Sequence, residues 1–144
     1  MYNGGGENLL MAAVAIVQDG KWVLESSYPN TPSLRSVEKA IQTVLPQIEL
    51  ADHKKTFQHE KIHIHYKVFG ECCYLVVAKP DYPMRICFEF LEAVQTNHTR
   101  TRTRNVKPLL KEKLAYFNNP ENDRIINIKG KIDDVKQDMI INIG

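Results

Sequence analysis

Two segments of this 144-residue chain are apolar on both faces of an extended conformation, and they constrain the fold more than any other feature. Residues Leu9–Val17 and Cys72–Ala78 form nearly continuous apolar runs. Successive side chains of a strand point to opposite faces, so such a run must be covered on both sides. We therefore predict two buried strands, with Cys72–Ala78 at the centre of a sheet.

Turn signals and alternating patterns predict the other strands. Asp19-Gly20 is a tight hairpin signal, so Lys21–Ser26 is expected to pair with the first strand. Apolar residues alternate with polar ones over residues 62–69, which indicates a half-buried strand. Thr56–Glu60 is predicted as a further edge strand, after a polar loop over Ala51–Lys55. Together these segments make a five-stranded antiparallel sheet.

Three helices are expected to cover that sheet. Helical spacing of apolar residues predicts an amphipathic helix over Leu34–Ile48. Pro83 suits the first turn of a second helix, whose two apolar stripes over Met84–Val94 need cover on more than one side. Thr96–Lys107, where arginine alternates with threonine, is predicted to be a mobile basic loop. The third helix presents a core face of Leu110, Leu114 and Phe117. This order of elements indicates an α+β fold with helices on both faces.

The end of the chain follows a different period. Asn118-Asn119-Pro120 is expected to end the third helix and start a fourth, which divides the chain into a domain of residues 1–118 and a tail of residues 119–144. In the tail, a spacing of 3, 4, 3, 4, 3 predicts the a/d seam of a coiled coil. The seam consists of Ile125, Ile128, Ile132, Val135, Met139 and Asn142. A lone helix of this kind does not offset its conformational entropy, so it packs on its own domain or seeks partner helices.

The tail and the domain both resemble one family. Asp123–Gly144 is similar to the N-terminal half of the R-SNARE motif, most recognisably over Ile132–Met139 and Asn142-Ile143. The domain resembles a longin domain at His65-Tyr66, Cys73–Val77 and Phe88–Glu92. From Leu9 onward the chain is thus similar to longin-type R-SNAREs of the synaptobrevin-like long vesicle-associated type. Tyr82-Pro83 is also similar to the ER–Golgi type of longin SNARE.

The resemblance implies a profilin-like longin fold followed by a partial coiled-coil SNARE helix. It implies that the six seam residues form early layers of a four-helix bundle with Q-SNARE helices, which drives membrane fusion in vesicle trafficking. The longin domain would regulate this step by folding the tail back onto itself or by binding a sorting adaptor. The family's fold-back groove corresponds to Leu34–Ile48 and the strand near Thr56–Ile64.

The same resemblance implies that the central-layer arginine and a membrane anchor follow Gly144. The expected location is the cytosolic face of endomembranes or transport vesicles. The alternative function is a longin- or profilin-like adaptor or scaffold in trafficking, without fusion activity.

Other kinds of chemistry receive little support from the sequence. A zinc site is conceivable because three histidines precede two cysteines, namely His59, His63, His65, Cys72 and Cys73. However, adjacent cysteines on a strand face opposite ways, so we predict no metal and no disulfide. Cys87 falls on a core stripe without a base beside it, and no phosphate loop or dinucleotide fingerprint occurs. We therefore expect neither enzyme activity nor a cofactor.

Charge and hydropathy also limit the partners. The net charge of +2 is too small to indicate nucleic acid as the main partner, and the Thr-Arg run lacks interleaved aromatic residues. No apolar stretch approaches the length of a membrane span.

Overall fold

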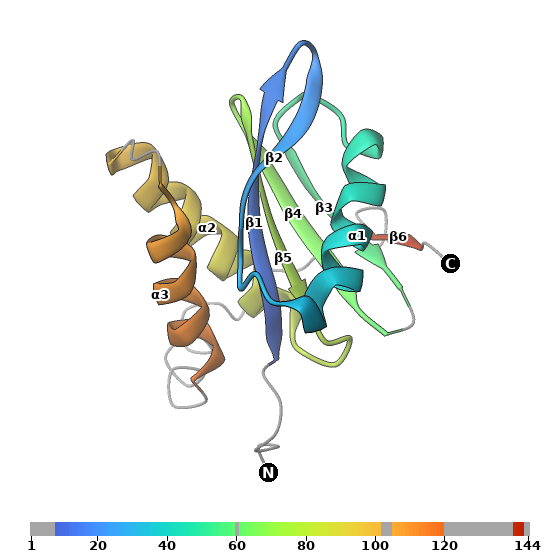
Figure 1. Cartoon of the computed structure of the whole chain (residues 1–144), viewed down its shortest axis with the longest axis vertical. Helices are drawn as coiled ribbons and strands as arrows, with labels where there is room; N and C mark the ends of the chain where they lie inside the picture. The colour runs from blue at the N-terminus through green and yellow to red at the C-terminus, as the bar shows by residue number, and fades with distance from the viewer. Residues whose placement is uncertain (1–7, 60, 102–104, 120–139, 143–144) are drawn as a thin grey trace.

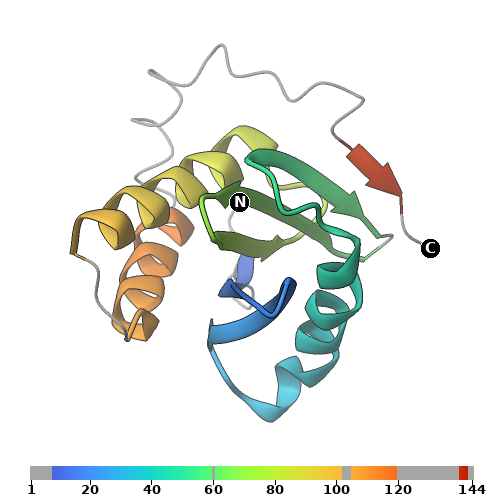
Figure 2. The ribbon, with the colours of Figure 1, turned by 90° about the horizontal axis from the view of Figure 1, so that it is seen from above.

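The computed structural model describes residues 8–59, 61–101, 105–119 and 140–142. One sheet stands between α1 on one face and α2 with α3 on the other (Figures 1 and 2). The elements are β1 (Leu9–Gln18), β2 (Lys21–Tyr28), α1 (Arg35–Val44), β3 (His53–Gln58), β4 (His63–Phe69), β5 (Cys72–Ala78), α2 (Met84–Thr101), α3 (Lys107–Asn118) and β6 (Ile140–Asn142). Short 3-10 turns flank α1 at Pro32–Leu34 and Leu45–Gln47.

The strand order in the sheet is β2-β1-β5-β4-β3-β6. The first five strands pair antiparallel, which confirms the predicted five-stranded sheet and its α+β class. The β1–β2 turn has positive φ at both central residues, 54° at Asp19 and 75° at Gly20, as a tight hairpin of this kind requires. β6 adds a short sixth strand that runs parallel to β3, and no sequence pattern predicted it.

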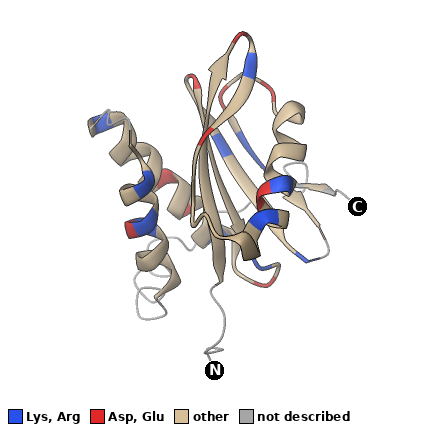
Figure 3. Cartoon of the chain, viewed as in Figure 1, with Lys and Arg blue, Asp and Glu red and all other residues tan. Residues whose placement is uncertain are grey.

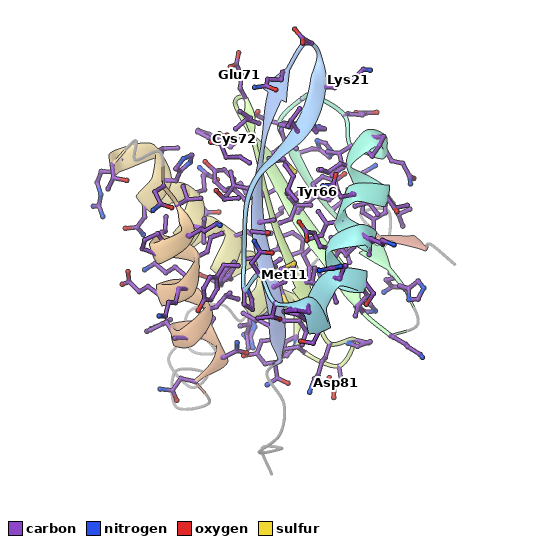
Figure 4. The ribbon with its side chains drawn as sticks, viewed as in Figure 1. Met11, Lys21, Tyr66, Glu71, Cys72 and Asp81 are labelled. Carbon is purple, nitrogen blue, oxygen red and sulfur yellow. The ribbon has the colours of Figure 1, made fainter. Side chains whose placement is uncertain are left out.

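The two apolar runs are buried on both faces, as predicted. Neither β1 nor β5 contains a charged residue (Figure 3). Alternate residues enter two separate cores. Met11 and Leu75 belong to the core beneath α1, together with Tyr66 of β4 (Met11 and Tyr66 are labelled in Figure 4). Val14 and Val76 belong to the core beneath α2 and α3.

The predicted basic loop is mostly helix. α2 continues to Thr101, so the prediction of a loop over Thr96–Lys107 was wrong for its first six residues. The polar side chains there bond back to the helix: Asn97 donates to the Ala93 carbonyl at 2.9 Å, and Thr99 donates to the Gln95 carbonyl at 2.9 Å. These bonds satisfy the polar side chains within the helix itself.

The edge strand β3 begins earlier than predicted. It starts at His53 rather than at Thr56, inside the segment that we expected to be a polar loop. His53 opposes Val68 in the register, and its ring shares a hydrogen bond of 2.8 Å with the hydroxyl of Tyr66. Polar residues form a strand here because β4 supplies their partners, which are distant in sequence.

Asn118, the last residue of α3, fastens the end of the domain to its beginning. Its side-chain oxygen accepts hydrogen bonds from the backbone N–H groups of Asn8 and Leu9 at 3.0 and 2.8 Å. Its side-chain nitrogen donates to the Leu9 carbonyl at 3.0 Å. Nearby, the Tyr82 hydroxyl donates to the Phe117 carbonyl at 2.6 Å. The tail therefore leaves from a fixed point on the sheet.

We expect Asn118→Ala to lower the free energy of unfolding by about 2 kcal/mol, because three hydrogen bonds to Asn8 and Leu9 are lost and two backbone donors lose this acceptor. Urea unfolding followed by the fluorescence of the single tryptophan, Trp22, measures this change. Asn97→Ala is the matched control, since Asn97 bonds only within α2 in the contacts described above. Equal effects of the two substitutions would contradict the role of Asn118.

Candidate functional site

The outer edge of β3 is paired with a piece of the tail. Ile140–Asn142 lies parallel to Thr56–Gln58, with Ile141 opposite Phe57 (β3 and β6 in Figure 1). A bare strand edge presents backbone N–H and C=O groups that readily accept another strand. The tail segment satisfies this edge and closes the sheet on the side next to α1.

Ile141 attaches the tail to the core beneath α1. Its partner Phe57 is fully buried in that core, between the sheet and the helix. Ile141 itself is half-buried and packs against the same cluster. Other half-buried residues at this rim are Leu34, Val37, Ala40 and Ile62. The tail thus makes a side-chain contact with the domain in addition to its backbone pairing.

A groove of about 350 Å³ lies between α1 and the β3–β4 connection. It is lined by Ser36, Val37, Ala40, His59, Lys61 and Ile62. The N–H of His59 donates to the Ile62 carbonyl at 2.9 Å and closes the connection. Because β6 runs parallel to β3, it is directed toward the end of β3 from which this connection starts. An apolar floor with polar walls at this place suits an extended peptide with apolar side chains.

The opposite face of β3 is fixed by a buried polar pair. Thr56 Oγ1 and His65 Nδ1 share a hydrogen bond of 2.8 Å, and both residues are fully buried. The ring of Phe88 on α2 lies edge-on to His65 with 5.4 Å between centroids. Burial, and to a lesser degree the charge on His63, lowers the pKa of His65 from 6.5 to about 3. His65 is therefore neutral near pH 7, and the pair holds β3 to β4.

Two lysines border this face. Lys54 Nζ lies 5.2 Å from the centroid of the Phe88 ring, a cation–π distance. Lys67 Nζ lies 2.7 Å from Glu92 Oε1 of α2. Glu92 is mostly exposed, so this ion pair orients the side chains more than it stabilises the fold.

The structure places the residues weighed for zinc and thiol chemistry on β4, on β5, on α2 and in the β3–β4 connection. His63 and His65 share a face, with 6.0 Å between ring centroids, whereas Cys73 faces the core beneath α1. Among the residues that the structure describes, no three His, Cys, Asp or Glu side chains gather as a metal cluster. Burial raises the pKa of the thiols of Cys72, Cys73 and Cys87, which keeps them protonated. Such thiols are poor nucleophiles.

The predicted seam meets the structure at one residue. Ile125, Ile128, Ile132, Val135 and Met139 lie outside the described residues. Asn142 lies in β6, so the prediction of a helix through this residue was wrong for the isolated chain. The outer edge of β3 offers hydrogen bonds to this segment. The assignment of the six residues as bundle layers stays a prediction.

The comparison with known families identifies most of the domain. The longin family model, described as a Regulated-SNARE-like domain, matches residues 24–117. No curated protein matches the chain. Within the described part of the chain, no helix is long and apolar enough to cross a membrane.

We expect His65 to make the fold sensitive to acid. Its pKa is about 3 in the folded chain and 6.5 when unfolded, so its contribution is complete above pH 6.5 and is lost as the pH falls toward 3. The free energy of unfolding of the wild type minus that of His65→Gln should shrink by about 2–3 kcal/mol between pH 7.5 and pH 4.5. Urea titrations at both pH values measure the difference. If the free energy of unfolding changed with pH equally in both proteins, the lowered pKa of His65 would be contradicted.

Proposed function

The chain belongs to the longin family, and from this premise we propose that it is an R-SNARE of vesicle trafficking. Family membership itself connects the chain with SNARE proteins and with the regulation of trafficking at endomembranes. The proposal adds that the tail forms one helix of a four-helix bundle with three Q-SNARE helices. The longin domain would regulate the exposure of the tail, either by folding the tail back onto itself or by binding a sorting adaptor.

The observation that carries this proposal is the pairing of β6 with β3. Asn142 belongs to the predicted seam, yet the structure has it extended on the edge of the domain. A residue cannot be in a strand and in a helix at the same time. The docked tail is therefore incompatible with a bundle helix over Ile140–Asn142. The β3–β6 pairing would thus control whether the tail can enter a bundle.

The length of the connecting segment permits both states. Residues 119–139 join the end of α3 to β6. Fully extended at about 3.3–3.6 Å per residue, this segment spans roughly 70 Å, so it can reach the far edge of its own domain. Since α3 is fastened to β1 by Asn118, undocking the tail leaves the domain intact.

We propose two further points. The first is that the chain is not an enzyme, and the second is that the SNARE motif and a membrane anchor continue after Gly144. The protonated, buried thiols support the first part. The resemblance of Asp123–Gly144 to the first half of the R-SNARE motif supports the second. The alternative is a trafficking adaptor or scaffold without fusion activity. The following experiment separates the two functions.

We expect Ile132→Asp and Met139→Asp each to weaken binding to a complex of three Q-SNARE helices by on the order of 100-fold or more, because a carboxylate enters an apolar layer. Gln137→Asp introduces the same group off the seam and should leave binding within about twofold. Calorimetry or fluorescence anisotropy with the whole chain gives the affinities. Unchanged binding in both seam variants would refute the R-SNARE assignment and favour the adaptor module.

We also expect slow hydrogen exchange in the isolated chain at Ile140–Asn142 and at the facing residues Thr56–Gln58, since their amides lie in or beside the β3–β6 pairing. A chain ending at Asn118 should exchange faster at Thr56–Gln58 and unchanged at β5. Mass spectrometry of peptides from both proteins measures this. Complete exchange within seconds across Asp123–Ile143 would exclude a stable docked state.

A further inference from the structure

The tail contains isoleucines that the predicted bundle does not need. With Ile125 at position a of the heptad, the off-seam residues from 127 to 138 are all polar or glycine. They are Asn127, Lys129, Gly130, Lys131, Asp133, Asp134, Lys136, Gln137 and Asp138. The pattern then changes abruptly, and Ile140, Ile141 and Ile143 occupy off-seam positions. Ile140 and Ile141 fall at b and c, which face solvent in a four-helix bundle.

The change of pattern coincides with β6. The strand consists of Ile140–Asn142, and two of its three residues are these off-seam isoleucines. β-Branched side chains favour a strand over a helix. Ile141 lies opposite the fully buried Phe57 and packs against the core beneath α1. Ile141 is thus an off-seam isoleucine that packs on the core of the domain.

We infer that Ile141 is a latch residue: it selects the docked state of the tail and has no share in bundle formation. This inference rests on the proposed function. The tail then carries two separate sets of side chains, with the seam recognising partner helices and Ile141 recognising the core beneath α1, opposite Phe57. Each set of contacts can be altered by substitution without touching the other, since the sets share no residue. Because the docked and bundled states exclude each other, weaker docking leaves more of the tail available to partner helices.

The receiving surface supports this division. Phe57 provides the buried floor, and half-buried apolar residues of α1 and of the β3–β4 connection stand around it. Ile141 remains half-exposed, so its replacement by a polar residue leaves no cavity inside the domain. A substitution at Ile141 therefore changes the docking of the tail without unfolding the longin domain.

The test uses the whole chain with Ile141→Asn, Ile126→Asn and Val135→Asn. Each variant replaces a branched apolar residue of the tail, but Ile126 is off-seam and outside β6, and Val135 is on the seam. We expect Ile141→Asn to speed amide exchange at Thr56–Gln58 by about tenfold, because part of a buried isoleucine contact is lost. Ile126→Asn and Val135→Asn should change this exchange by less than about twofold.

Binding to a preassembled bundle of three Q-SNARE helices, one each of the Qa, Qb and Qc types, is the second readout. The affinity of Ile141→Asn should equal or exceed that of the wild type. The affinity of Val135→Asn should be lower on the order of tenfold or more. Ile141→Val, which keeps a branched apolar side chain, should restore slow exchange at Thr56–Gln58.

Two results would overturn the inference. One is an exchange rate at Thr56–Gln58 in Ile141→Asn equal to that in Ile126→Asn. The other is a loss of bundle binding in Ile141→Asn as large as that in Val135→Asn. If the wild type itself does not bind the Q-SNARE helices, the proposed function fails, while the exchange measurements still decide whether Ile141 holds the tail.

Discussion

The fold depends on one constraint, the burial of β1 and β5 on both faces. Neither strand carries a charged side chain, so water must be excluded from both sides of the sheet centre. α1 covers one face, and α2 with α3 covers the other. This cover extends along the faces only, so the antiparallel part of the sheet still ends in two strands, β2 and β3, whose outer backbone groups the helices do not satisfy.

The two edges of this five-stranded part meet this problem differently. Along β2, exposed and half-buried residues alternate, and Lys21 and Glu25 are exposed, which discourages pairing with another chain. β3 instead pairs with the tail. The buried Thr56–His65 bond holds β3 to β4, so a fixed edge is presented to the tail segment Ile140–Asn142. Order on one side reduces the entropy that docking must overcome.

Local patterns predicted those elements whose stability is local or whose burial is complete. The strands predicted at Leu9–Val17 and Cys72–Ala78, and the helix α1, follow from the order of apolar residues, and the β1–β2 turn follows from the Asp19-Gly20 pair. The early start of β3 and the existence of β6 depend on partners distant in sequence, which no local pattern contains. At the site, a search for a repeat of 3.5 residues found the seam. That repeat does not include Ile141, because this residue packs on the domain only when the tail is docked as a strand.

The weakness of the docked strand suits a control element. Three residues of parallel pairing and one half-buried isoleucine would not hold a separate peptide, since ordering the chain offsets most of the gain. Attachment through residues 119–139 changes the balance, because a tether of this kind gives an effective concentration on the order of millimolar. In the proposed mechanism, a bundle that buries a whole seam would outcompete so small a contact. A longer or more apolar strand would dock more tightly, but it would keep the tail from partner helices.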